Sequence, residues 1–80
     1  MRLDKFLKVT RVIKRRTIAQ EICSAGKVLV NGDIKKASYE IKKDDELEVH
    51  YFNRIIKVKI LDIPKESLKK EDIENYIKII

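Results

Sequence analysis

The stretch that decides the fold is Met1–Thr17, which reads M-R-L-D-K-F-L-K-V-T-R-V-I-K-R-R-T. Its apolar and small side chains recur every three or four positions, the spacing of one helix face, at Leu3, Phe6, Leu7, Thr10 and Ile13. The intervening lysines and arginines face elsewhere. This pattern predicts an amphipathic first helix over residues 2–10, followed by a basic corner at Lys14–Arg16.

The residues after this corner predict a second helix and a turn. Thr17 with Gln20 three positions later has the spacing of a capping box, so we expect a helix to begin at Thr17 and to end at Gly26 in a left-handed cap. Val28–Val30 reads as a short strand, and Asn31-Gly32 is typical of a tight turn. The apolar face of this second helix would consist of Ile18, Ala19, Ile22 and Cys23.

The second half of the chain changes to a period of two. Apolar residues alternate with polar ones over 46–51 and again over 56–60, which predicts an antiparallel hairpin with Phe52–Arg54 at its tip and one buried face. Pro64 is expected to stop the second strand, and residues 67–80 to form a terminal helix. The predicted fold class is therefore α+β: two helices, a small mainly antiparallel sheet and a short closing helix.

The excess positive charge is concentrated in the first third of the chain. The 80 residues have a net charge of +6; residues 1–27 contain eight basic and two acidic side chains, whereas residues 28–80 contain eleven of each. A solvated helix face is the simpler explanation of such a cluster. A surface that binds a polyanion is favoured, because Lys and Arg that meet phosphates supply most sequence-independent affinity for nucleic acid.

Other functional classes find little support in the sequence. Eighty residues suit one domain, 1–80, and no apolar run is long enough to span a membrane. The lone Cys23 cannot form an intrachain disulfide, which fits a reducing cytoplasm, and we expect a buried structural thiol. His50 lacks neighbouring metal ligands, and neither Gly26-Lys27 nor Asp44–Glu46 completes a phosphate or calcium loop. We expect no enzyme activity, no metal and no cofactor.

An ordered series of motifs resembles the alpha-L, or S-four-type, RNA-binding domain. The series covers about residues 1–50 and consists of M-R-L-D-K-F-L at 1–7, R-x-x-K-x-R-T at 11–17, G-K-V-L-V-N-G at 26–32, Lys36-x-Ser38 and Asp45-x-Leu47-x-Val49. The resemblance implies two helices packed on a small sheet, with RNA on the helical side. Asp44 departs from the family, which usually has Gly there, but Asp tolerates a left-handed turn.

Stand-alone domains of this kind resemble two bacterial groups, the ribosome-associated heat-shock proteins and the RqcP family of ribosome quality-control factors. The latter resemblance implies binding to obstructed large ribosomal subunits, where the protein contacts ribosomal RNA and peptidyl-tRNA and holds the tRNA in the peptidyl site during alanine tailing. The implied partners are the ribosomal RNA of the large subunit, peptidyl-tRNA and an alanine-tailing factor. We expect a cytoplasmic monomer without membrane contact.

Charge and resemblance together select the candidate RNA-binding residues, which are Arg2, Lys5, Arg11, Lys14, Arg15, Arg16, Thr17 and Lys36. Arg2 and Arg16 match the family motif and rank first, since guanidinium groups bind phosphate in two-pronged fashion. Asp4 is expected to orient a neighbouring arginine. The aromatic residues at positions 6, 39, 51 and 52 are expected to serve the core or the hairpin rather than to stack on bases.

Three alternatives remain open at this stage. The same domain would suit a heat-shock factor that recycles subunits or a ribosome-assembly factor. It would also suit an RNA-binding accessory of an RNA-modifying enzyme that acts in trans. The basic first helix would also suit docking on anionic lipid.

Overall fold

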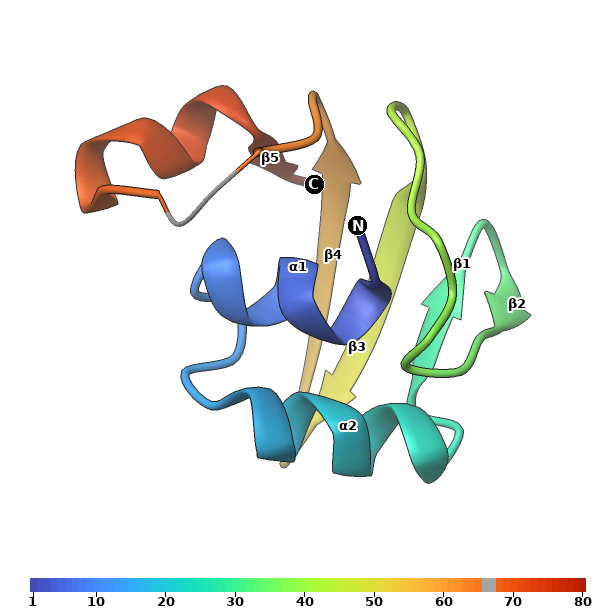
Figure 1. Ribbon diagram of the computed structural model, residues 1–80. Helices are drawn as coiled ribbons and strands as arrows, with labels where there is room; N and C mark the ends of the chain where they lie inside the picture. The colour runs from blue at the N-terminus through green and yellow to red at the C-terminus, as the bar shows by residue number, and fades with distance from the viewer. Residues whose placement is uncertain (66–67) are drawn as a thin grey trace.

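Five strands form one antiparallel sheet in the order β2-β1-β3-β4-β5, and two helices cover one of its faces (Figure 1). This computed structural model describes residues 1–65 and 68–80. The helices are α1 (Leu3–Val9), α2 (Arg16–Ser24) and the 3-10 helix η1 (Lys70–Asn75). The strands are β1 (Val28–Val30), β2 (Asp33–Ile34), β3 (Glu46–Tyr51), β4 (Arg54–Ile60) and β5 (Ile77–Ile79). The predicted α+β class is confirmed.

The core lies between the helices and the sheet. Leu3, Phe6 and Leu7 of α1 are fully buried, as the predicted helix face requires, and the alternating apolar residues of β3 and β4 face them. The odd positions of β3 and the even positions of β4 are inside because successive strand side chains point to opposite faces of a sheet. In residues 1–65 and 68–80, no helix has both the length and the apolarity to cross a bilayer.

The capping box predicted at Thr17 is wrong, whereas the predicted end of α2 is confirmed. Helix α2 begins at Arg16, its N-cap Arg15 makes no side-chain cap hydrogen bond, and Gln20 instead donates to the carboxylate of Asp4. A glutamine held by another helix cannot reach back to cap its own. At the other end Gly26 has φ +73°, and the Lys27 amide donates to the Ile22 carbonyl at 2.9 Å.

The predicted turn at Asn31-Gly32 and the predicted β3–β4 hairpin are confirmed, but the tip of the hairpin is shorter than predicted. Asn31 and Gly32 have φ values of 51° and 88° and join β1 to β2, where Val30 pairs with Asp33. The β3–β4 hairpin pairs Tyr51 with Arg54, so Arg54 is the first residue of β4 rather than part of the tip. Asp44 has φ 72°, the left-handed turn that its short side chain tolerates.

The prediction for the C-terminus is wrong in its extent. Residue 67, where the terminal helix was expected to begin, lies outside the described residues; helical structure covers only 70–75, and 77–79 form a strand. Strand β5 pairs with the free edge of β4, with Ile60 opposite Ile77 and Val58 opposite Ile79. An available sheet edge therefore overrides the local helical pattern. Strand β4 ends at Ile60, which is paired with Ile77 of β5, so the strand stops before Pro64 is reached and the proline is not the residue that ends it.

The left-handed cap of α2 leads to a first prediction. A β-carbon at position 26 would lie 3.8 Å from the side chain of Ile34, which is ordinary contact, so Gly26→Ala adds backbone strain without a clash. We expect the free energy of unfolding to fall by about 1 kcal/mol, and by less for Gly26→Asn. Urea titration measures it. Ser24→Ala, at an exposed position of the last turn, is the control; equal effects of all three changes would contradict the assignment.

Candidate nucleic-acid interface

A fully buried carboxylate, that of Asp4, joins the two helices. Its Oδ1 accepts hydrogen bonds from Arg2 Nε at 3.2 Å and from the Lys5 amide at 2.9 Å. Its Oδ2 accepts from Arg16 Nε at 3.2 Å and from Gln20 Nε2 at 3.0 Å. Donors from both helices therefore converge on one acid, which fixes how α2 lies against α1.

The environment of Asp4 keeps it ionised. Burial alone would raise the pKa of this carboxyl, but hydrogen bonds from Gln20, Arg16 and the Lys5 amide outweigh it and hold the pKa below its ordinary value. The expectation that Asp4 orients a neighbouring arginine is confirmed, and it orients two. A charged acid held by two charged bases leaves the cluster with a net positive charge.

The two arginines present their terminal nitrogens to solvent. Asp4 binds each guanidinium through Nε, and the Arg2 and Arg16 side chains remain 49% and 43% exposed. Within residues 1–65 and 68–80, no protein acceptor engages their terminal nitrogens. A guanidinium held in this way has lost much of its rotamer freedom and keeps the edge that binds phosphate in two-pronged fashion.

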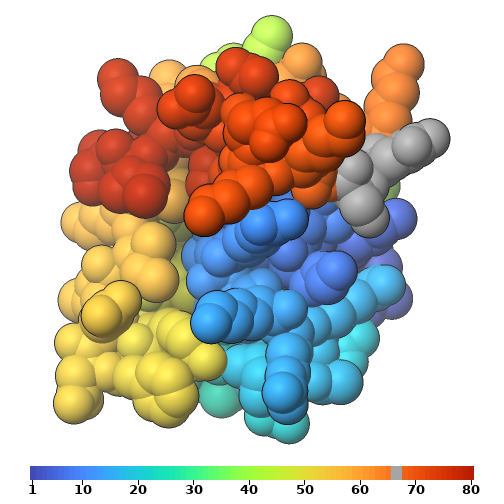
Figure 2. Space-filling view, turned by 90° about the vertical axis from the view of Figure 1, so that its left-hand side faces the viewer, coloured from blue at the N-terminus to red at the C-terminus, as the bar shows by residue number. Residues whose placement is uncertain are grey.

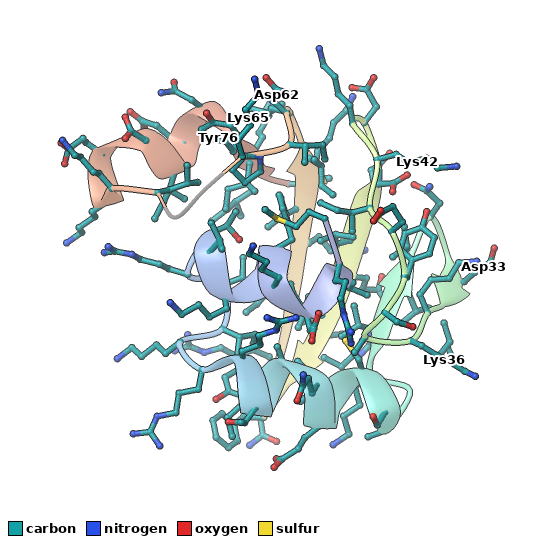
Figure 3. All side chains as sticks on the ribbon, viewed as in Figure 1. Asp33, Lys36, Lys42, Asp62, Lys65 and Tyr76 are labelled. Atoms are coloured by element: carbon teal, nitrogen blue, oxygen red, sulfur yellow. The ribbon has the colours of Figure 1, made fainter. Side chains whose placement is uncertain are left out.

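The start of α1 is built against the loop that contains Lys36. The Leu3 and Asp4 amides donate to the carbonyls of Tyr39 and Ala37 at 2.8 and 3.2 Å, so backbone rather than a side chain caps the helix. Arg2 and Lys36 consequently line one hollow of about 570 Å³ beside the end of α2. Figure 3 shows Lys36 on this side, pointing away from the fold near the C-terminal end of α2.

The other predicted cations gather at the opposite end of α2. Arg11, Lys14 and Arg15, in the connection between the helices, line a groove of about 620 Å³. Lys5 and Thr17 are exposed on α1 and in the first turn of α2, and neither lines these two hollows. The structure thus places Arg2 and Lys36 near one end of α2 and Arg11, Lys14 and Arg15 near the other. Asp4 holds Arg2 and Arg16 between the two helices, and Lys5 and Thr17 belong to neither group.

Sequence reasoning missed one member of this surface. Arg54, the first residue of β4, lines the same groove as Arg15, together with Tyr51 and Phe52 at the hairpin tip. The signal was available in part, because a basic residue beside a hairpin tip is visible in the sequence. Its proximity to the helical corner is not, since it depends on how the sheet packs beneath α2.

Cys23 and His50, the other residues considered for chemistry, lie in environments that suit a structural role. Cys23 is buried, and burial followed by the nearby Asp4 charge raises its pKa to about 11, so the thiol stays protonated at neutral pH as expected. His50 lies on the outer sheet face, 2.6 Å from Glu48, whose pKa this hydrogen bond lowers. Among residues 1–65 and 68–80, no three His, Cys, Asp or Glu side chains converge as a metal site.

The chain matches known proteins over most or all of its length. A family model described as the S4 domain matches residues 1–47. A protein of Streptococcus pneumoniae named RQC P-site tRNA stabilizing factor is 46% identical over all of this chain and 90% of its own length. Proteins of the same name from Bacillus subtilis and Helicobacter pylori are 44% and 40% identical, over 100% and 96% of this chain and 92% and 93% of their own lengths.

Two solved structures share the fold. The trimeric Heat Shock Protein 15 of Vibrio cholerae superposes with a TM-score of 0.90 over 100% of this chain and 81% of that one, at 22% identity, a likeness of fold alone. The solution structure of a hypothetical protein, HP1423, has a TM-score of 0.86 at 38% identity, over 100% of this chain and 96% of the other.

The buried acid leads to a second prediction, which concerns stability and pH. Asp4→Asn removes the charge that faces two guanidinium groups, so the free energy of unfolding at neutral pH should fall by about 2 kcal/mol. Because the pKa of Asp4 is lower in the folded chain, the unfolded chain binds its proton more tightly. The contribution of Asp4 to wild-type stability is therefore fully present above about pH 4, and it is lost as the pH falls through the pKa that Asp4 has in the folded chain.

Urea unfolding at neutral and acidic pH measures both effects. The variant should lack the part of the acid dependence that Asp4 supplies, so the two stability curves converge as the pH falls. Asp44→Asn, at an exposed turn position where Asn also tolerates positive φ, is the matched control and should leave the curve unchanged. Parallel curves for the wild type and Asp4→Asn would contradict the assigned role.

Proposed function

Because the chain belongs to the S4 domain family and, within it, to the RQC P-site tRNA stabilizing factors, we propose that it binds obstructed large ribosomal subunits and holds peptidyl-tRNA in the peptidyl site. Under this proposal it contacts ribosomal RNA and tRNA together while a stalled chain is rescued and extended by alanine tailing. It acts by binding, as a single domain over residues 1–80, and catalyses no reaction itself.

One observation supports this function above the others: Asp4 fixes two arginines with their terminal nitrogens in solvent. The carboxylate binds Arg2 through Oδ1 and Arg16 through Oδ2, each at 3.2 Å, so their guanidinium groups are oriented before any ligand arrives. Pre-orientation lowers the entropy that binding must remove. Phosphates of a structured RNA suit such a pair, and we propose Arg2 and Arg16 as its principal ligands.

The distribution of the other cations suits a protein placed between two RNA segments. We propose that Lys36 and Arg2 contact one segment near the C-terminal end of α2, and that Arg11, Lys14 and Arg15 contact another near its N-terminal end. Lys5 and Thr17 add exposed contacts on the helical side. Since helical RNA is read through its shape, phosphates and 2′-hydroxyls, this set would recognise a folded RNA rather than a base sequence.

Further parts of the proposal concern partners and place. We propose that the protein works in the cytoplasm as a monomer, beside an alanine-tailing factor on the same subunit, and that it needs neither metal nor cofactor. The high pKa of the buried Cys23 thiol agrees with a structural role for this residue. The outer sheet face neutralises part of its own charge, since Glu48 lies within 3.7 Å of Lys57, and this directs RNA to the helical side.

Subunit recycling after heat shock is the competing function. The likeness to Heat Shock Protein 15 of Vibrio cholerae is 22% in sequence and concerns the fold alone, whereas the relatives named for tRNA stabilisation are 46% and 44% identical. The two functions differ in the particle that is bound. Affinity purification from cells should recover large subunits that contain peptidyl-tRNA; recovery of subunits or precursors without it would favour recycling or assembly.

A third prediction tests the two leading arginines. Arg2→Ala and Arg16→Ala should be less stable but should still fold, because each leaves Asp4 with three of its four hydrogen-bond donors, and they should no longer co-sediment with large ribosomal subunits at moderate salt. Each lost phosphate contact should also reduce the slope of log affinity against log salt by about 1. Sedimentation at several salt concentrations measures both.

Two further variants make this result interpretable. Arg16→Gln retains a donor for Asp4 while it removes the guanidinium, so it should reproduce the binding defect with a smaller effect on stability. Lys78→Ala removes one exposed cation from β5, on the outer sheet face, and should co-sediment like the wild type. Co-sedimentation of the two alanine variants at the wild-type level would refute the assignment.

A further inference from the structure

The groove between the α1–α2 connection and the β3–β4 hairpin tip is lined by more than the cations that could bind phosphate. Arg11, Lys14 and Arg15 line one side, and Arg54 and Phe52 line the other. Figure 2 shows the light-blue atoms of the α1–α2 connection beside the yellow atoms of the β3–β4 hairpin. Phe52 is 87% exposed as a residue, and its ring lies 4.4 Å from the ring of Tyr51, centroid to centroid, at an angle of 37°. A large apolar ring therefore stands in solvent among four cations.

Two bulky residues on this groove adopt a backbone conformation that is costly for them. Arg11 follows the last turn of α1 with φ 61°, at the position where helices usually have glycine, and Phe52 has φ 54° at the first central position of a two-residue hairpin turn. The other described non-glycine residues with positive φ are Asn31 and Asp44, which tolerate it. Strain of this kind concentrates at functional sites, and here both residues line the same groove.

The charges of the groove are unpaired within the part of the chain that the structure describes. No carboxylate in residues 1–65 or 68–80 forms an ion pair with Arg11, Lys14, Arg15 or Arg54, in contrast to Arg2 and Arg16 at Asp4. None of the residues that line the groove is acidic. The groove therefore favours an anionic ligand, and its exposed ring favours a ligand that also has a flat apolar face.

We propose that this groove binds an unpaired nucleotide of RNA, with the base stacked on Phe52 and the adjoining phosphates held by Arg54 and the cations of the α1–α2 connection. This inference rests on the proposed function and extends it, since paired RNA offers phosphates but no free base. It also revises the expectation that Phe52 serves only the hairpin. An acidic protein segment would satisfy the cations without using the ring, so the combination favours RNA.

A fourth prediction tests the ring separately from the charges. Asn tolerates φ 54° better than Phe does, so Phe52→Asn should remove the stacking surface while the urea midpoint stays equal or rises. The probes are a short RNA stem–loop with unpaired loop bases and a blunt RNA duplex with the same number of phosphates. The wild type should bind the stem–loop more tightly, and Phe52→Asn should weaken that complex by about 5- to 100-fold while it leaves duplex binding unchanged.

Three matched variants accompany it. Phe52→Trp keeps an aromatic face and should preserve the preference for the stem–loop. Ile55→Asn replaces the next exposed apolar side chain of the hairpin, 61% exposed and paired with His50 on the outer sheet face, and should bind both RNAs like the wild type. Arg54→Gln should weaken both complexes and reduce their salt dependence, because it removes charge rather than stacking.

The outcomes separate this proposal from the function on which it rests. Equal binding of the stem–loop by Phe52→Asn and the wild type would overturn the stacking site, as would equal affinity of the wild type for both RNAs while it still co-sediments with large subunits. A wild type that binds neither RNA nor subunits would overturn both proposals. Normal RNA binding by Phe52→Asn with weakened binding to large subunits would assign the ring to a protein contact instead.

Discussion

The rest of the structure depends on one buried ion, the carboxylate of Asp4. A charge removed from water must be compensated by donors, and here the donors come from both helices, so the position of α2 against α1 follows from satisfying this acid. The compensating groups are arginines whose outer edges remain in solvent. One interaction therefore completes the packing of the helices and at the same time orients the surface that we propose for RNA.

A second acid, Asp45, holds the loop that follows β2 in place, much as Asp4 holds the two helices together. The side chain of Asp45 accepts hydrogen bonds from Asn31, the Tyr39 hydroxyl and the Lys42 amide, at 2.9–3.2 Å, while the Asn31 side chain also binds the Glu46 amide. These contacts fasten residues 35–45 to the β1–β2 turn, and the same loop supplies the carbonyls that cap α1. Asp45 thus helps to hold in place the loop that contains Lys36 through its hydrogen bonds to Asn31, Tyr39 and Lys42.

The sequence predicted correctly the elements that depend on local pattern. Its predictions were wrong where a residue distant in the sequence determines the local structure. The first helix, both hairpins and the Gly26 cap follow from periodicity and turn chemistry. Gln20 was predicted to cap its own helix, but its side-chain amide donates to the buried carboxylate of Asp4 on the other helix. Ile77 and Ile79 were predicted to be helical, but they form a strand because they pair with the free edge of β4. The motif singled out Arg2 and Arg16, which the structure brings together at Asp4, whereas the groove shared by Arg15 and Arg54 exists only after the sheet has packed under α2.

The two faces of the molecule differ in how far their positive charges are balanced by carboxylates, and this difference determines which face a polyanion approaches. On the outer sheet face Glu48 lies beside both His50 and Lys57, and Glu46 is opposite Lys59, so carboxylates offset much of the positive charge there, although Lys78 adds a further cation opposite Lys59. Residues 1–27, which include both helices, contain eight cations against two acids, the buried Asp4 and the exposed Glu21. Unbalanced charge raises the free energy of the folded state through self-repulsion, and a bound polyanion would remove that repulsion. Because the excess lies on one side, the same field that makes the isolated protein less stable also turns that side toward RNA before contact.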